Sequence, residues 1–365
     1  MTALGEARAV GVDSPTDAWI VQYCNGIRTS CRDNGVNSTL MHWDGAAWSA
    51  TTGLLSLDLN SIVAASPSNA WAAGENAYGP GGPAAVILHW DGAHWTNAPI
   101  TGNSVNSYLW SLSADAPTDA WAVGYRERGD GTTAAYVLHW NGATWSQVTS
   151  PSPGSNSYQL LSVSAVSSTD VWAVGETSDA TGASGAFLLH WNGASWLQFA
   201  SPTSLSENAQ LEAVSATAGG AWAVGTTGTY PTQSPLFLRL SGGQWSEVNG
   251  VAPGGAIIRI TGVSTVSPTD AWMVGSYCPT GFCTGNTCSG SGCFNENILV
   301  EHWNGQAWTE VTVPEPSPTI NELYDITADG PSDIWAVGLD QGPQQHDKAL
   351  TLHWNGSRWS DVWPG

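Results

Sequence analysis

Tryptophan recurs along this 365-residue chain at a nearly constant interval, and that interval restricts the fold more than any other feature. The motif Asp/Asn-x-Trp, or a close variant, occurs seven times, with its tryptophan at Trp19, Trp71, Trp121, Trp172, Trp222, Trp272 and Trp335. A second motif, Leu-His-Trp-Asn/Asp-Gly-x-x-Trp or a variant of it, follows each copy and ends at Trp48, Trp95, Trp145, Trp196, Trp245, Trp308 and Trp359. Seven copies of a strand-rich unit of about 50 residues predict a β-propeller.

The fourth repeat shows how one unit is expected to fold. Alternating residues over 160–165 and the segment 171–175 predict two strands joined by a tight turn. Two further strands, 187–191 and 195–199, flank Asn192-Gly193, which is the strongest short signal for a hairpin turn. No segment shows a sustained 3.6-residue period, so we expect essentially no helix. Each unit is therefore a four-stranded antiparallel blade of an all-β, seven-bladed β-propeller.

The repeats define one propeller domain over residues 1–365, because the units depend on one another for burial. The expected blades are 6–52, 53–102, 103–152, 153–203, 204–252, 253–314 and 315–365. The chain starts at the innermost strand of blade 1 and ends in the outermost strand of blade 7. No strand is left for exchange between these two blades. We therefore expect closure by face-to-face packing, with Trp363 as a candidate contributor.

The charge balance excludes some classes of partner. Only 9 basic residues stand against 30 acidic ones, for a formal net charge of −21. Nucleic-acid binding needs a basic face that displaces counterions, so we expect no nucleic-acid partner and no anionic membrane surface. The chain has no run of about 18 apolar residues. Its first residues also lack the basic and apolar regions of a signal peptide. It is therefore either cytoplasmic or a mature domain with an added initiator methionine.

The cysteines favour the mature, secreted alternative. All six lie in two Gly/Ser/Thr-rich insertions, at Cys24, Cys31, Cys278, Cys283, Cys288 and Cys293. An even number of loop cysteines is typical of disulfides formed in an oxidising compartment. Cys24–Cys31 is the simplest bridge, and three pairings are open for the other four. A zinc site is the rival interpretation, but zinc prefers tighter CxxC pairs, so we predict no metal and no cofactor.

The periodic tryptophans and histidines have structural explanations. Twenty of the 22 tryptophans are in register, which indicates packing between blades rather than sugar-binding platforms; Trp110 and Trp363 lie outside the pattern. Six histidines occupy the His-Trp step, one in each blade except the fifth, and are too far apart to share one ion. Each is expected to bond the Asp of Thr-Asp-x-Trp, as His139 with Asp119. Blade 5 lacks both partners, having Gly220 and Arg239 instead.

Binding is expected at the mouth of the central channel, on the face that carries the long, varied loops. Aligned repeats place the following residues at the start of the inner strands: Arg8, Asn60, Trp110, Leu161, Glu212, Thr261 and Tyr324. Their neighbours on this face include Glu6, Asp58, Tyr108, Gln159, Arg259 and Glu322, with Tyr23, Glu75, Tyr125, Glu176 and Tyr277 at the ends of the second strands. We selected as candidate ligand-binding residues Arg8, Asn60, Tyr108, Trp110, Tyr125, Glu176, Glu212, Arg259 and Tyr324.

The repeat order Ser-Val-Ser, Asp-x-Trp-Ala-Val-Gly, Leu-His-Trp-Asn-Gly-x-x-Trp resembles kelch-type blades, although a single Gly ends the second strand here. It is also similar to the repeats of bacterial seven-bladed propeller lectins, which carry an Asp-Gly-x-x-Trp element. The resemblance covers the whole chain and implies a propeller and, from the lectins, sugar binding. The copper ligands of galactose oxidase, a kelch-type enzyme, have no match in this sequence.

Three functions follow from these observations. The favoured one is a secreted, monomeric, non-catalytic propeller that binds a glycan or an extracellular protein. The alternative is an enzyme acting on polysaccharide, with Glu212 and either Glu322 or Asp325 as its carboxyl pair if it is a glycosidase. A lyase would instead use Arg8 or Arg259 to neutralise a uronate. A structural surface or filament subunit is the third possibility.

Overall fold

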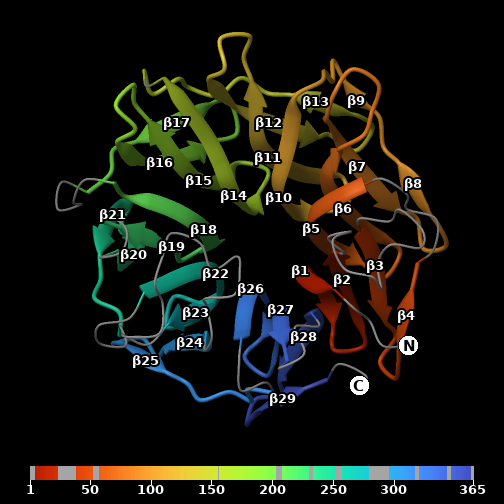
Figure 1. The fold of residues 1–365 in the computed structure, drawn as a ribbon, viewed down its shortest axis with the longest axis vertical. Coiled ribbons are helices and arrows are strands. Elements are labelled where there is room, and N and C mark those ends of the chain that lie inside the picture. Colours follow the sequence, from red (N-terminus) through yellow and green to blue (C-terminus); the bar gives the residue numbers. More distant parts are fainter. Residues whose placement is uncertain are drawn as a thin grey trace.

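Seven β-sheets stand around a central channel in the computed structural model, as the repeat predicted (Figure 1). The structure describes residues 5–23, 38–51, 57–154, 156–202, 208–229, 233–251, 257–278, 296–316, 320–342 and 347–362. Within these ranges the chain forms strands and turns but no helix, and accordingly no helix that could cross a membrane. The all-β, seven-bladed prediction is confirmed.

Each blade is an antiparallel meander whose first strand lines the channel. Blade 1 has β1 (Glu6–Ser14), β2 (Asp17–Tyr23), β3 (Ser38–Trp43) and β4 (Trp48–Ala50). Blade 2 has β5 (Leu57–Ser66), β6 (Asn69–Asn76), β7 (Ala84–Trp90) and β8 (Trp95–Asn97). Blade 3 has β10 (Ser107–Ala116), β11 (Asp119–Glu127), β12 (Thr133–Trp140) and β13 (Trp145–Gln147). Blade 4 has β14 (Ser157–Ser167), β15 (Asp170–Ser178), β16 (Ser184–Trp191) and β17 (Trp196–Phe199).

The remaining three blades repeat this order. Blade 5 has β18 (Gln210–Thr217), β19 (Gly220–Thr227), β20 (Ser234–Ser241) and β21 (Gln244–Glu247). Blade 6 has β22 (Ile257–Ser267), β23 (Asp270–Cys278), β24 (Asn297–Trp303) and β25 (Trp308–Glu310). Blade 7 has β26 (Ile320–Gly330), β27 (Asp333–Gln341), β28 (Asp347–Trp354) and β29 (Trp359–Asp361). No strand is exchanged between the first and last blades, as predicted.

One sheet departs from the four-stranded pattern. The two-residue strand β9 (Ile100–Thr101), on the way from blade 2 to blade 3, pairs in parallel with β13 at the outer edge of blade 3. That sheet therefore has five strands. The alternation of residues did not reveal β9, because two residues are too few to show a period. Its effect is to cover an otherwise open sheet edge.

Indole packing holds neighbouring blades together. Trp121 in blade 3 packs edge-on against Trp196 of blade 4, with ring centroids 5.2 Å apart, and stacks on His139 of its own blade at 4.2 Å. The seam between the last and first blades uses the same arrangement, with Trp335 against Trp48 at 6.0 Å. Burial of about 150–250 Å² per indole, at about 25 cal/mol per Å², contributes about 4–6 kcal/mol each. Thirteen of the 20 periodic tryptophans are buried, in agreement with the predicted packing role, and the other seven are half-buried.

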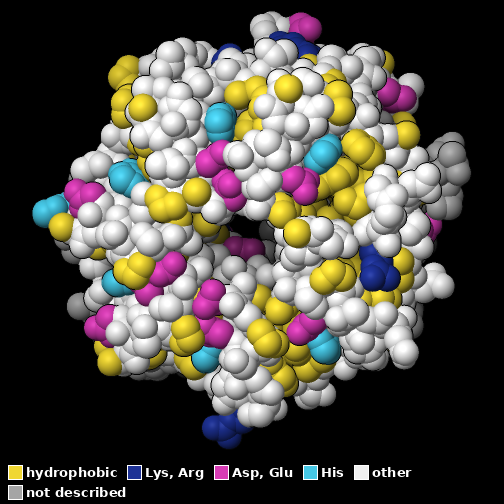
Figure 2. Space-filling model, turned by 180° about the vertical axis from the view of Figure 1, so that it is seen from behind, with side chains coloured by type: hydrophobic (Ala, Val, Ile, Leu, Met, Phe, Trp, Pro, Cys, Tyr) yellow, Lys and Arg dark blue, Asp and Glu magenta, His cyan; other side chains and the backbone are white. Residues whose placement is uncertain are grey.

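The predicted His–Asp pairs lie on the face opposite the variable loops. Figure 2 shows that face, with histidines spaced around the central opening and acidic side chains beside several of them. The hydrogen-bonded pairs are His42–Asp17, His139–Asp119, His190–Asp170, His302–Asp270 and His353–Asp333. In blade 5, Arg239 takes the place of the histidine and donates to the Pro268 carbonyl at 3.1 Å.

In blade 2 the predicted hydrogen bond of the histidine does not form. This blade has Asn69 where five other blades have Asp, and its histidine was predicted to pair like the others. However, Asn69 Oδ1 and His89 Nε2 are both buried and make no hydrogen bond. A neutral amide attracts the ring N–H less strongly than a carboxylate does. Burial lowers the pKa of His89, which has only the nearby Asp91 charge to oppose this effect.

Candidate binding site at the channel mouth

The residues predicted at the channel mouth share one backbone feature. Each is the extra residue of a β-bulge near the start of an inner strand, where the register to the second strand shifts by one. The seven bulge residues are Arg8, Asn60, Trp110, Leu161, Glu212, Thr261 and Tyr324. A bulge frees a side chain from the alternation of the strand and re-aims it. The structure thus gives the mouth seven equivalent positions with seven different residues.

A glycine inside the second strand allows the inner strand to approach closely at this bulge in six of the seven blades. A Cβ atom on Gly124 would lie 2.0 Å from the carbonyl oxygen of Tyr108, and one on Gly175 would lie 2.1 Å from that of Gln159. No side chain fits at that distance, so in these blades the inner strand can lie this close to the second strand only because the residue there is glycine. Blade 1 departs from the pattern with Gln22 at this position.

Arg8 is the centre of a satisfied network on blades 1 and 2. Its guanidinium donates to Glu6 at 2.9 Å and to Asp58 at 2.8 Å, and lies 3.3 Å above the ring of Tyr23. It also donates to the side-chain oxygen of Asn60 at 3.3 Å. Burial opposes the positive charge, but the neighbouring carboxylates prevail and raise the pKa of Arg8. The Nε and Nη1 donors of Arg8 are thus engaged by protein groups, and the two carboxylates offset its charge.

Asn60 extends the hydrogen-bond network of Arg8 from blade 2 to blade 3. Its amide donates to Glu75 at 3.1 Å and to the backbone carbonyl of Leu109 at 3.0 Å, so it spans the seam between the two blades. Burial, together with the nearby charge of Asp58, raises the pKa of Glu75 to about 7. An amide and a carboxyl are therefore fixed at the mouth next to the aromatic residues of blade 3.

Three aromatic rings from β10 and β11 form a stack. The Tyr125 ring lies 4.7 Å from Tyr108 and 6.2 Å from Trp110, at interplanar angles of 15° and 26°. Burial raises the pKa of Tyr125 to about 12, so its hydroxyl is neutral and can donate a hydrogen bond. All three side chains are half-buried. The structure thus brings together three of the predicted ligand-binding residues.

Carboxyl groups dominate the other half of the mouth. Glu176 accepts a hydrogen bond of 2.6 Å from Gln159, and its charge lies close enough to affect Glu212. Burial, reinforced by Glu176 and opposed by Arg259, raises the pKa of Glu212 to about 7. Burial raises the pKa of Glu322 to about 8, and so do the charge of Glu296 and the hydrogen bond that protonated Glu322 donates to it, while Tyr324 and Arg259 act in the opposite direction.

Sequence reasoning missed Glu296. It is 3 % exposed, lies just before β24, and its backbone pairs with blade 7 through Asn321. It belongs to the end of the cysteine-bearing insertion of blade 6, which is longer than the corresponding segment of any other blade. The repeat therefore could not assign it a position.

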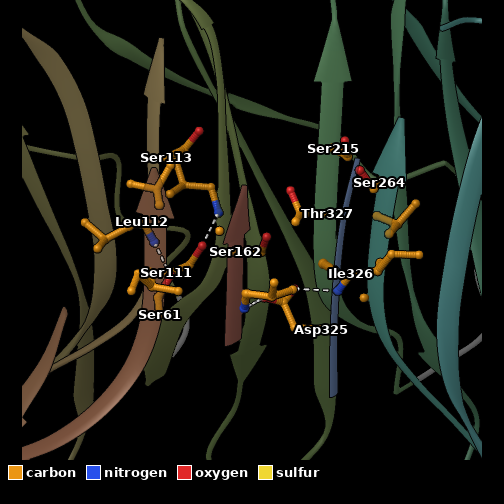
Figure 3. A pocket seen from close by; sticks show the side chains of 18 of the residues that line it. Ser61, Ser111, Leu112, Ser113, Ser162, Ser215, Ser264, Asp325, Ile326 and Thr327 are labelled. Carbon is orange, nitrogen blue, oxygen red and sulfur yellow. Dashed lines mark hydrogen bonds between the residues drawn. The ribbon is translucent and has the colours of Figure 1, made fainter. Parts of the chain in front are cut away.

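Asp325, a candidate catalytic carboxyl, lies below the mouth in the wall of the channel (Figure 3). It lines a cavity of about 200 Å³ together with hydroxyl groups of Ser61, Ser111, Ser162 and other inner-strand residues. Its two oxygens accept hydrogen bonds of 2.9 Å from the amides of Val10 and Ile326. Burial raises the pKa of Asp325 to about 7, against the lowering effect of those two bonds. The bond from Val10 joins blade 1 to blade 7, so Asp325 helps to close the ring.

The cysteines lie mostly outside the described residues. Cys278, at the end of β23, is buried and disulfide-bonded. Cys24, Cys31, Cys283, Cys288 and Cys293, like Trp363, fall outside the described ranges, so the predicted pairings stay predictions. Within those ranges, no group of three or more His, Cys, Asp or Glu side chains is placed to hold a metal ion.

Comparison with known proteins identifies the fold but not a family. Neither a protein-family model nor a curated protein matches the sequence. Among solved structures, the PL25 ulvan lyase bound to -[GlcA(1-4)Rha3S]- aligns with a TM-score of 0.61 and 9% identity, covering 99% of this chain and 96% of that one. YCF48 bound to D1 peptide aligns with a TM-score of 0.57 and 16% identity, covering 97% and 95%. The WD40 β-propeller domain of Doa1 aligns with a TM-score of 0.54 and 12% identity, covering 96% and 94%.

At these identities the likeness shows the fold alone. The propeller architecture that the sequence resemblance implied is confirmed. A specific relation to kelch-type blades stays a prediction.

Proposed function

We propose that this protein is a secreted, monomeric propeller that binds carbohydrate at the channel mouth without transforming it. The observation that carries the proposal is the stack of Tyr108, Tyr125 and Trp110 beside the amide of Asn60 and the carboxyl of Glu75. Flat rings next to a few fixed polar groups suit a sugar, whose C–H face packs on an aromatic ring while its hydroxyls form hydrogen bonds.

The contrast between the two faces supports the same choice. On the opposite face, tryptophan N–H groups bond turn carbonyls, as Trp140 does with Pro117 at 3.3 Å, and the histidines mostly bond aspartates. The mouth instead differs from blade to blade. Variation over a regular scaffold is typical of a recognition surface. The ulvan lyase structure contains a saccharide and the YCF48 structure a peptide, so an extracellular protein is the other ligand class to test.

A glycan array followed by titration calorimetry tests the proposal. Trp110→Ala should weaken binding of the best glycan by about tenfold or more, which corresponds to about 1.4 kcal/mol. The matched control is Leu161→Ala, which truncates the same bulge position in blade 4 and should change affinity less than about twofold. Failure of the protein to bind any glycan, or equal losses in the two variants, would contradict the proposal.

A second function, cleavage of polysaccharide, is favoured by Glu212 and Glu322. Carboxyls with pKa values of about 7 and about 8 can act as general acids near neutral pH, and both lie near the Arg259 charge. Incubation with a panel of polysaccharides, with assays for new reducing ends and for unsaturated uronides, tests this function. Turnover that Glu212→Gln or Glu322→Gln abolishes would replace the binding proposal with an enzymatic one.

A further inference from the structure

Most charged side chains at the channel mouth have a hydrogen-bonding partner. Glu6 and Asp58 pair with Arg8, and Glu75 and Glu176 accept from side-chain amides. Glu322 is bonded to Glu296 and Tyr324. Arg259 and Glu212 differ, because neither forms a hydrogen bond or ion pair with any residue in the described part of the chain.

These two unpartnered groups lie on adjacent inner strands. Glu212 is the bulge residue of β18 in blade 5, and Arg259 lies two residues before the bulge residue Thr261 on β22 in blade 6. Arg259 is exposed and Glu212 is half-buried. They are near enough for the Arg259 charge to act on the Glu212 carboxyl. A ligand at this seam thus meets an exposed guanidinium beside a carboxyl.

The net charge of −21 does not prevent an anion from binding here. At physiological ionic strength charges are screened over about 8 Å, so the groups near Arg259 dominate. Burial raises the pKa of both nearby carboxyls, Glu212 to about 7 and Glu322 to about 8. At pH 6 these carboxyls are therefore largely neutral and can donate hydrogen bonds. The surroundings of Arg259 are then less negative than a count of acidic residues suggests.

We propose that Arg259 and Glu212 form a subsite for an acidic sugar, in which Arg259 binds a uronate carboxylate and Glu212 bonds a hydroxyl of the glycan. This proposal rests on the proposed carbohydrate-binding function and specifies its ligand class. A guanidinium presents paired N–H donors that match the geometry of a carboxylate. The neighbouring carboxyl suits a hydroxyl, which can donate to it or accept from it.

The test uses oligosaccharides whose acidic group alone is altered. Oligomers of galacturonate, glucuronate and mannuronate would be compared with their methyl esters by titration calorimetry at pH 6. At least one acid should bind about tenfold more tightly than its ester. Arg259→Gln should abolish this preference and leave ester affinity unchanged, whereas Arg259→Lys, which retains the charge without the paired donors, should reduce it. Glu212→Gln should weaken both forms.

Arg358→Gln is the matched control, because Arg358 is an exposed arginine in the β28–β29 turn on the opposite face. It should leave every affinity unchanged. Equal binding of every acid and its ester, with loss of both in Trp110→Ala, would overturn the subsite and leave carbohydrate binding intact. No binding of any oligosaccharide would overturn both. A short polyglutamate peptide that binds as tightly as the best uronate would overturn the assignment to a sugar.

Discussion

The carboxylate of Asp325 accepts a hydrogen bond of 2.9 Å from the backbone amide of Val10, which lies 315 residues earlier in the chain. This bond joins β26 of the last blade to β1 of the first. Equivalent bonds cross internal seams, from the amide of Leu112 to Ser61 and from the amide of Val163 to Ser111. The closing seam thus replaces a serine hydroxyl with a carboxyl.

Removal of this carboxyl should destabilise the ring. Asp325→Ala leaves the Val10 amide without its acceptor, which costs about 1–3 kcal/mol of unfolding free energy. Asp325→Asn keeps an acceptor oxygen and should lose less than about half as much. Denaturant unfolding at pH 6, below the Asp325 pKa of about 7, measures both changes. Equal stability of Asp325→Ala and the wild type would show that the bond does not support closure.

The glycine beneath the mouth should not tolerate a methyl group. Gly124→Ala places a carbon about 2.0 Å from the Tyr108 carbonyl and should cost about 3 kcal/mol or more, because the inner strand must move. The same variant should weaken glycan binding by displacing Trp110. Gly129→Ala is the control, since a Cβ there meets nothing within 4 Å, and it should change stability by less than about 0.5 kcal/mol. Similar melting temperatures for the two variants would contradict the bulge explanation.

A substitution in blade 2 should stabilise the protein. Asn69→Asp restores the acceptor that His89 lacks and should add about 1 kcal/mol, the typical gain from a hydrogen bond. It should also raise the His89 pKa, because a carboxylate favours the charged ring. Thermal unfolding and NMR titration of His89 measure the two effects. A lower melting temperature, or an unchanged pKa, would show that the pairing in the other blades has a different basis.

The raised carboxyl pKa values give stability a defined pH dependence. Glu75, Glu212, Glu322 and Asp325 have pKa values of about 7 to about 8 in the folded protein, against about 4 when unfolded. The folded state therefore binds protons more tightly, and its extra stability is present below pH 4 and is lost as the pH rises toward 8. The melting temperature should fall between pH 5 and pH 8.

Gln variants separate this effect from general charge repulsion. Glu212→Gln and Glu322→Gln should each flatten the fall, whereas Glu247→Gln, at an exposed position on β21, should not. A steeper fall in the first two variants would contradict the assigned pKa shifts.

The period of the repeat made the fold and the mouth positions predictable. Trp110 and Glu212 occupy the same position in blades 3 and 5, and a closed ring must bring such positions to one opening. The repeated glycines could be read from the sequence, but the reason for them could not. Gly124 is crowded by the Tyr108 carbonyl only because the two strands approach closely in the folded blade.

The contacts of some mouth and channel residues could not be predicted from the repeat. Asp325 was predicted as an alternative partner of Glu212 in a carboxyl pair at the channel mouth. Its bond to Val10 depends on closure between the two ends of the chain, and no local pattern encodes that. Glu296 escaped notice because its insertion is longer than the corresponding segment of any other blade, so the repeat gave it no aligned position. Arg8 was predicted as a ligand-binding residue, yet its donors are engaged by Glu6 and Asp58.

Hydrogen–deuterium exchange with a bound glycan tests most directly whether the channel mouth is the binding face. Peptides that cover 107–110 and 124–127 report on the mouth, and peptides that cover 117–119 and 141–144 report on the opposite face. A saturating glycan ligand should slow exchange in the first pair and leave the second pair unchanged. Protection confined to the turns of the opposite face would contradict the account.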